Sequence, residues 1–242
     1  MEIIPYFTMG YPDDSTVLAA LKTAIRNGVH KIELGYPSPD PKYDGPGIKR
    51  THLGNPASID SDYPEIFSEL REHGISYYAL LYYSDVCTDL DYSLRRLKEL
   101  GFKGLILPDL LIDYFSESKQ IITHIQGQSL EFVPFFTQAT PDAVIREVSR
   151  KTRSWIYYGL QPSTGIIVPL DFKSVGRRVG ELLAGRNVVY GFGIRGTRDV
   201  ELLRNMGAYG AAVGSAFVEH LRYGDMGSIA ELLKEMGGAA SA

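Results

Sequence analysis

Three absences narrow what this chain can be. It has one cysteine, Cys87, so no disulfide can form within the chain, and a cytoplasmic setting is expected. Its formal net charge is −4, so no basic field predicts nucleic-acid binding. No apolar run reaches the length of a membrane span and no signal peptide precedes the first strand-like run, so we expect no membrane association.

Two kinds of catalysis are also disfavoured. A Schiff-base mechanism needs a lysine at the carboxyl end of a strand, but Lys31 and Lys103 stand where predicted strands begin. A catalytic metal needs clustered histidines and carboxylates. The five histidines are scattered along the chain, so we expect surface residues rather than metal ligands; they are His30, His52, His73, His124 and His220.

The chain does contain a regular alternation of strand-like and helix-like segments. Its apolar runs lack strict polar/apolar alternation, which suits parallel strands buried on both faces. Eight strand–helix units in 242 residues favour an α/β fold of the closed (β/α)8 or TIM-barrel type, and residues 1–242 are expected to form a single domain. The predicted strands are 3–8, 31–35, 76–82, 103–108, 130–136, 155–160, 187–192 and 209–213.

Helix boundaries are predicted from capping residues. Asp13 or Asp14 is expected to start the first helix, which Gly28 ends. Thr140 and Thr197 are expected to be N-caps, with Pro141 as the first helical residue after Thr140. A short helix is expected within the irregular segment 36–62, and the tail 237–242 is expected to be frayed.

An acid within an apolar strand is the most informative feature. Glu33 lies in the run 31–35, and the proline-rich loop that follows carries Asp44. A buried acid is costly unless it is paired, neutral or functional. We interpret Glu33 and Asp44 as a catalytic acid/base pair at the carboxyl ends of the strands, where such barrels gather their reactive groups. The structural alternative pairs Glu33 with Lys31 or an arginine and leaves Asp44 as a turn residue, which is the favoured interpretation of Asp44 taken alone.

Glycines after the seventh and eighth predicted strands indicate a phosphate site. Gly193 and Gly214 each precede a helix, and Ser215 can add a hydroxyl donor. These two loops are the usual phosphate cradle of the barrel fold. Thr164 and Gly165, after the sixth strand, are a further candidate contribution. The alternative is that the glycines serve only tight turns.

One motif suggests a different ligand. The run 191–196 matches G-x-G-x-x-G, the dinucleotide fingerprint, which belongs on a first strand with an acid at the end of the next. Here it follows the seventh strand, and the next strand ends at Val213-Gly214. We therefore expect no dinucleotide cofactor, and a phosphorylated small substrate is the remaining prediction.

The chain resembles the tryptophan synthase alpha subunit family over nearly its whole length. The segments that carry the resemblance are 4–12, 32–46, 105–110, 191–194 and 213–216. The resemblance implies a lyase that cleaves indole-3-glycerol phosphate to indole and glyceraldehyde 3-phosphate in tryptophan biosynthesis, with no cofactor or metal. It also implies a partner, the tryptophan synthase beta subunit, in an α2β2 assembly. The chain departs from the family pattern at Ser38-Pro39 and in the loop 161–165.

The resemblance also implies roles for individual residues. Glu33 would move protons between the glycerol hydroxyl and the indole carbon, and Asp44 would accept the indole N–H. Thr164 would tie its loop to Asp44 on closure. The remaining implied contacts are Gly165, Gly193, Gly214 and Ser215 with phosphate, Phe192 as a wall of the indole pocket, and Tyr82 and Tyr157 as lining residues, with Ile156 or Tyr158 as alternatives to Tyr157.

Two other functions remain open from the sequence. The chain could be another phosphate-binding barrel enzyme that uses the same two acids. It could also be a non-catalytic alpha-like barrel that activates a beta subunit.

Overall fold

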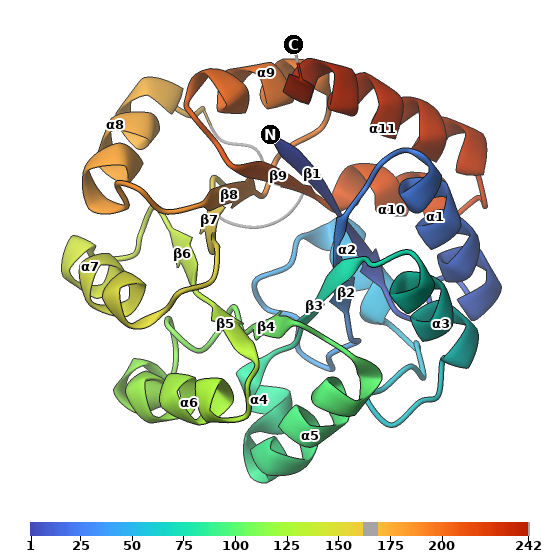
Figure 1. Ribbon diagram of the computed structural model, residues 1–242, viewed down its shortest axis with the longest axis horizontal. Coiled ribbons are helices and arrows are strands. Elements are labelled where there is room, and N and C mark those ends of the chain that lie inside the picture. The colour runs from blue at the N-terminus through green and yellow to red at the C-terminus, as the bar shows by residue number, and fades with distance from the viewer. Residues whose placement is uncertain (162–168, 242) are drawn as a thin grey trace.

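The strands form a closed ring surrounded by helices (Figure 1). The structure, a computed structural model, describes residues 1–161 and 169–241. The described strands form a parallel sheet in the order β5-β4-β3-β2-β1-β9-β8-β7-β6. The strands are β1 Glu2–Thr8, β2 Lys31–Gly35, β3 Ser76–Leu80, β4 Gly104–Ile106, β5 Glu131–Val133, β6 Phe135–Thr137, β7 Ile156–Gly159, β8 Val188–Gly191 and β9 Gly210–Val213. The prediction of a (β/α)8 barrel is confirmed.

Pro134 explains why one predicted strand, 130–136, forms two strands. Residues before it pair with β4, and residues after it pair with β7. A proline has no N–H to donate to a neighbouring strand, so the ladder is interrupted at this position. Its carbonyl still accepts the N–H of Tyr157 at 3.0 Å. Because β5 and β6 are the two ends of the sheet order and only Pro134 separates them, the sheet closes into a barrel.

The helices follow the strands around the outside of the ring (Figure 1). No helix within residues 1–161 and 169–241 has the length and apolar character needed to cross a membrane. The helices are α1 Asp14–Arg26, α2 Pro46–His52, α3 Pro64–Glu72, α4 Tyr83–Val86, α5 Leu90–Leu100, α6 Phe115–Gly127, α7 Asp142–Lys151, α8 Phe172–Leu182, α9 Thr197–Asn205, α10 Ser215–Leu221 and α11 Met226–Ser241, with a 3-10 turn η1 at Cys87–Asp89.

Helix α5 illustrates how the local sequence determines the two ends and the buried face of an outer helix. The Asp89 side chain accepts the N–H of Tyr92 and caps the helix. The helix ends at Gly101, whose φ of 93° is the left-handed conformation that glycine adopts readily. Leu94 and Leu97, at helical spacing, are fully buried against the sheet. Local capping and apolar periodicity therefore define both ends and the buried face of this helix.

Two predicted caps are wrong by one residue. Helix α7 has Pro141 as its N-cap, because the hydroxyl of Thr140 accepts the N–H of Thr137 in the preceding turn instead of capping the helix. Helix α9 has Gly196 as its N-cap and Thr197 as its first residue. Its first turn is held instead by Asp199, whose carboxylate accepts the N–H of Arg195 at 2.9 Å.

The end of the chain corrects a further expectation. Residues 237–241 continue helix α11 instead of fraying, and Ala239 and Ala240 are buried. Arg204 on α9 donates to the carbonyl of Ala239 at 2.8 Å. Small apolar side chains and this contact to a neighbouring helix extend α11 beyond the predicted stop at Met236.

Helix α4 was not expected after the third strand. Asp109, which follows β4 and is fully buried, accepts the N–H groups of Tyr83 and Ser84 at 2.7 and 2.9 Å. An acid at these N–H groups satisfies the start of a helix that is too short to be recognised from periodicity. The loops after β3 and β4 are thereby joined at the carboxyl end of the barrel.

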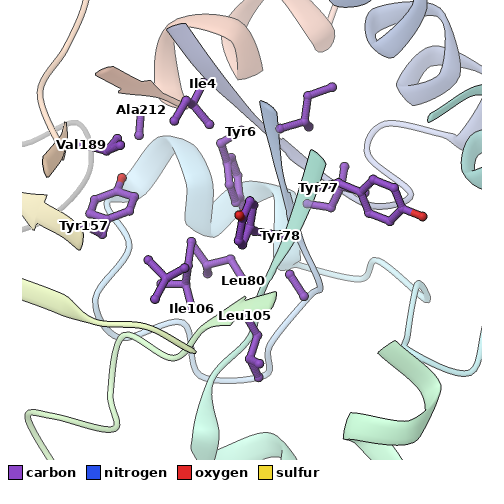
Figure 2. Packing of buried hydrophobic residues seen from close by; sticks show 14 of the residues in the cluster. Ile4, Tyr6, Tyr77, Tyr78, Leu80, Leu105, Ile106, Tyr157, Val189 and Ala212 are labelled. Carbon is purple, nitrogen blue, oxygen red and sulfur yellow. The ribbon is translucent and has the colours of Figure 1, made fainter. Parts of the chain in front are cut away.

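The core divides between the barrel interior and the layer under the helices. Figure 2 shows adjacent Tyr77 and Tyr78 on β3 pointing to opposite sides of the strand. Tyr77 packs edge-on against Phe102, at 5.0 Å between ring centroids. Tyr6 on β1 and Tyr157 on β7 both lie within the ring (Figure 2). Bulky residues therefore occupy the barrel interior, and a cavity lies at the carboxyl ends of the strands.

Candidate active site

Glu33 lies inside the barrel on β2, in register with Tyr6 on β1 and Tyr78 on β3. Its side chain is almost fully buried, and Oε1 has no hydrogen-bond partner among residues 1–161 and 169–241. Burial penalises the charged form and raises the pKa of Glu33 to about 8. An acid in this position is protonated at neutral pH and can give up its proton.

Lys31 does not neutralise Glu33. Its ammonium lies 3.0 Å from Glu2 Oε2 and 3.2 Å from the hydroxyl of Tyr209. Glu2 begins β1, and Tyr209 immediately precedes β9, so these groups lie at the amino end of the barrel. Lys31 therefore belongs to the face opposite the carboxyl ends, as predicted, and pairing with Glu33 is excluded.

Asp44 combines a turn position with a buried side chain. Its N–H donates to the carbonyl of Pro41 at 3.0 Å, while its carboxylate points inward and accepts the hydroxyl of Tyr82 at 2.9 Å. Burial raises the pKa of Asp44 to about 6, and the Tyr82 hydrogen bond and Lys49 oppose that rise. At neutral pH Asp44 is thus mostly a carboxylate, whereas Glu33 is mostly a carboxylic acid.

Both acids line one cavity at the carboxyl ends of the strands. It encloses about 410 Å³ of unoccupied space, part of it open to solvent. Seven predicted site residues are brought together in its wall: Glu33, Asp44, Tyr157, Phe192, Gly193, Gly214 and Ser215. Tyr157 lines it rather than Ile156 or Tyr158, and the Tyr158 hydroxyl instead contacts Arg178 at 3.2 Å. Tyr82 lies behind Asp44, and Thr164 and Gly165 lie outside the described residues.

Two glycines leave room for tyrosine hydroxyls beside the acids. A Cβ at Gly35 would overlap the hydroxyl of Tyr6, and a Cβ at Gly191 would overlap the hydroxyl of Tyr157. Gly35 ends β2, whose neighbour β1 carries Tyr6. Gly191 ends β8, whose neighbour β7 carries Tyr157. Gly35, two residues after Glu33, therefore has a packing reason: the absence of a Cβ leaves room for the hydroxyl end of the Tyr6 side chain.

The cavity wall after β8 has unusual backbone geometry. Phe192 has a φ of 66°, a left-handed conformation that side chains other than glycine seldom adopt, and Gly193 follows with a φ of 96°. Such a conformation costs on the order of 1–3 kcal/mol and persists where surrounding contacts determine it. The Phe192 ring packs against Phe135 and Tyr157, with centroids 5.3 and 6.0 Å apart. These contacts hold an aromatic surface in the cavity.

The cavity wall also includes backbone at the start of a helix. Gly214 is the N-cap of α10, and Ser215 is its first residue. N–H groups at the start of a helix have no partner within the helix and favour an anion. Gly193 lies in the same wall. The cavity thus combines backbone that suits an anion with two carboxyl groups.

Sequence reasoning missed several wall residues. They include Tyr6, Ile48, Leu80, Ile194 and Ala212. Strand position could have indicated Tyr6, because inward residues of neighbouring strands share a level and Tyr6 is in register with Glu33. Ile48 lies on α2, whose placement over the barrel mouth no local pattern indicates.

The expectation that all histidines lie at the surface is wrong for His52. It is the last residue of α2, and its side chain is buried, with Nδ1 accepting the N–H of Ser38 at 2.8 Å. Burial lowers the pKa of His52 to about 4, so the imidazole is neutral at neutral pH. In the described parts of the chain, no three histidine, cysteine or acidic side chains are grouped as metal ligands would be.

A closed barrel with two buried carboxyl groups at the carboxyl ends of its strands is the arrangement of a barrel enzyme that uses acid/base chemistry. Comparison with known proteins gives the family. The model of the family described as "Tryptophan synthase alpha chain" matches residues 1–236, and the chain belongs to this family of lyase subunits.

Individual relatives agree along almost the entire chain. The tryptophan synthase alpha chain of Sulfurisphaera tokodaii is 32% identical and covers 98% of this chain and 96% of its own length. The tryptophan synthase alpha chain of Saccharolobus solfataricus is 31% identical and covers 96% of this chain and 94% of its own length. A solved tryptophan synthase α2β2 complex of Pyrococcus furiosus contains a chain with the same fold, at a TM-score of 0.79 and 24% sequence identity. The match covers 98% of this chain and 97% of that chain.

Proposed function

We propose that this chain cleaves indole-3-glycerol phosphate to indole and glyceraldehyde 3-phosphate by a retro-aldol reaction. Family membership supports the reaction class. The observation that carries the proposal is the pairing of a protonated Glu33 with an ionised Asp44 in one cavity. Two carboxyl groups with separated proton affinities can serve as acid and as electrostatic partner at the same pH.

Glu33 handles both proton transfers of this reaction. Its carboxylic acid protonates carbon 3 of the indole ring, which leaves a positive charge on the ring. The resulting carboxylate then takes the proton of the hydroxyl on the carbon bonded to the ring, as the carbon–carbon bond breaks and its electrons return to the ring. The aldehyde leaves, and Glu33 is again protonated. The raised pKa of Glu33 suits a group that starts as an acid.

Asp44 stabilises the charge that develops on the ring. As a carboxylate it accepts the indole N–H and lies beside the positive charge formed when carbon 3 is protonated. The hydroxyl of Tyr82, 2.9 Å from Asp44 Oδ2, orients the carboxylate from behind the cavity wall. Tyr157 and Phe192 provide aromatic surface against the indole ring.

The phosphate group binds at the glycine-rich wall. Gly193, Gly214 and Ser215 direct backbone N–H groups and a hydroxyl to it, and Gly165 adds a further contact. The role that the family resemblance implies for Thr164 stays a prediction, because Thr164 lies outside the described residues. The presence of Gly193, Gly214 and Ser215 in the lining of the cavity that holds both acids supports this assignment.

The chain works with a tryptophan synthase beta subunit that receives indole, in an α2β2 assembly. The Pyrococcus furiosus chain with the same fold belongs to an α2β2 complex with mutual activation, which supports this partner. A single domain of residues 1–242 in the cytoplasm, without nucleic-acid or membrane partners, completes the proposal. The single cysteine, Cys87, is consistent with that compartment.

The direct test is turnover of indole-3-glycerol phosphate by the purified chain, alone and with a beta subunit. We expect indole to form in both cases and faster in the complex. Absence of indole in both, with the beta reaction stimulated, would replace the proposal by a non-catalytic activating role. Absence of both effects, with another phosphorylated substrate turned over, would indicate a different barrel enzyme.

A further inference from the structure

His52 is a buried polar residue that the proposed chemistry does not use. It ends α2, the helix that starts two residues after Asp44. Only 1% of its side chain is exposed, and Nε2 lies 3.9 Å from Asp44 Oδ2. Within residues 1–161 and 169–241, Nε2 has no hydrogen-bond partner. A buried donor without a partner is destabilising, so its place beside a carboxylate calls for a reason.

The backbone fixes the tautomer of His52. The N–H of Ser38 can only donate, so Nδ1, at 2.8 Å, must be the unprotonated acceptor nitrogen. A neutral imidazole carries one proton, which therefore resides on Nε2. Burial keeps the ring neutral by lowering its pKa. The donor of His52 thus faces Asp44, and its acceptor faces away from the cavity.

We propose that His52 is a positioning residue for Asp44, whose carboxylate form it favours by directing Nε2–H at Oδ2. The separation of 3.9 Å is longer than a hydrogen bond, and hydrogen bonds of catalytic groups commonly shorten when substrate binds. The role of Asp44 in turnover rests on the proposed function, whereas the effect of His52 on Asp44 does not.

Other groups also face Asp44 and set its charge. Tyr82 donates to the same oxygen, and Lys49 favours the carboxylate, whereas two further tyrosines lie close enough to be affected by its charge. In residues 1–161 and 169–241, the titratable groups that face Asp44 or share its cavity are Tyr82 after β3, Glu33 on β2, Lys49 and His52 on α2, Tyr6 on β1 and Tyr157 on β7. The tyrosines stay protonated over the working range, and Glu33, with a pKa of about 8, stays mostly protonated where Asp44 titrates, so a change at His52 acts against a nearly constant background.

The test is the pKa of Asp44, read from its carboxyl carbon-13 signal, which an Asp44→Asn spectrum identifies. His52→Leu removes the donor, so we expect the pKa of Asp44 to rise by roughly one unit, a tenfold change in the proton equilibrium. His52→Gln keeps a donor and an acceptor and should restore most of the difference. His73→Leu, the same substitution at an exposed histidine that follows α3, should leave the pKa of Asp44 unchanged.

An equal pKa of Asp44 in wild type and His52→Leu would overturn the inference and leave the catalytic role of Asp44 untouched. A raised pKa without a matching shift of the acidic limb of kcat/KM would support the inference and count against the catalytic role. Nitrogen-15 spectra of the wild-type imidazole give a test that needs no variant. A proton on Nε2 supports the inference, and a proton on Nδ1 overturns it.

Discussion

The hydroxyl of Tyr82 lies 2.9 Å from Oδ2 of Asp44 and donates to it. The same hydroxyl accepts the N–H of Tyr43 at 3.1 Å, so Tyr82 ties the end of β3 both to the carboxylate and to the loop that carries it. A hydrogen bond to a charged group contributes about 1.5–3 kcal/mol. The geometry around Asp44 therefore depends on a residue that does not itself line the cavity.

Replacing Tyr82 with phenylalanine tests that relationship. The change removes the donor to Asp44 and leaves the ring in place, so we expect kcat/KM for indole-3-glycerol phosphate to fall roughly tenfold, with the acidic limb of the pH profile at higher pH. Tyr83→Phe is the matched control, because the Tyr83 hydroxyl contacts Glu117 instead. Equal losses in both variants would show that Tyr82 acts only through packing.

The pH dependence of kcat/KM should be bell-shaped. Activity falls below about pH 6, where Asp44 takes up a proton, and falls above about pH 8, where Glu33 loses its proton. The two limbs report apparent pKa values of the site as a whole. Steady-state rates from pH 5 to pH 9.5 measure both limbs, and a rate still rising at pH 9 would contradict the assignment of Glu33 as the initial acid.

Stability should also depend on Glu33. Its pKa is about 8 in the folded chain and ordinary, near 4.5, in the unfolded chain, so the folded state binds more protons between these values. The free energy of unfolding therefore falls as pH rises from about 4.5 to 8, by on the order of 4 kcal/mol for this group.

Urea unfolding of wild type and Glu33→Gln at pH 5.5 and pH 8 measures that contribution. The variant cannot ionise, so its loss of stability between the two pH values should be smaller. Glu65→Gln, an exposed change on α3, is the control and should follow wild type. Parallel pH dependence of wild type and Glu33→Gln would mean that Glu33 is not perturbed by burial.

Gly193→Ala tests the phosphate wall. Its φ of 96° strains any side chain, and a Cβ would lie 2.7 Å from Cγ of Gln161. We expect KM to rise about tenfold and inhibition by inorganic phosphate to weaken correspondingly. Gly185→Ala supplies the same kind of strain, with a φ of 76° and no atom within 4 Å of the new Cβ. A similar rise of KM in both variants would remove Gly193 from the phosphate site.

Local signals predicted the frame of the molecule well. The strand Lys31–Gly35 and the cap of α1 at Asp13 follow from apolar runs and side-chain capping, which act over a few residues. The division of one predicted strand at Pro134 depends on the different neighbouring strands to which its two halves are hydrogen-bonded. The extension of α11 depends on contacts with α9. Such tertiary effects have no local signature in the sequence.

The site residues, like the fold, could be predicted only where the local sequence carries a signal. Glu33 is recognisable because a carboxylate inside an apolar strand needs a reason. His52 is not, because a histidine at the end of a short helix carries no mark of burial, and its two contacts lie 8 and 14 residues earlier in the chain. Tyr6 reads as an ordinary strand residue until the register with Glu33 is known.

Glu33→Gln gives the most direct measurement. Single-turnover formation of indole is compared with substrate affinity from calorimetry, for the variant and wild type in complex with the beta subunit. The account predicts that glutamine, which fits the site but cannot exchange protons, lowers the rate by at least about a thousandfold and changes the affinity by less than about threefold. Substantial indole formation by the variant, or loss of binding with the rate retained at saturation, would contradict it.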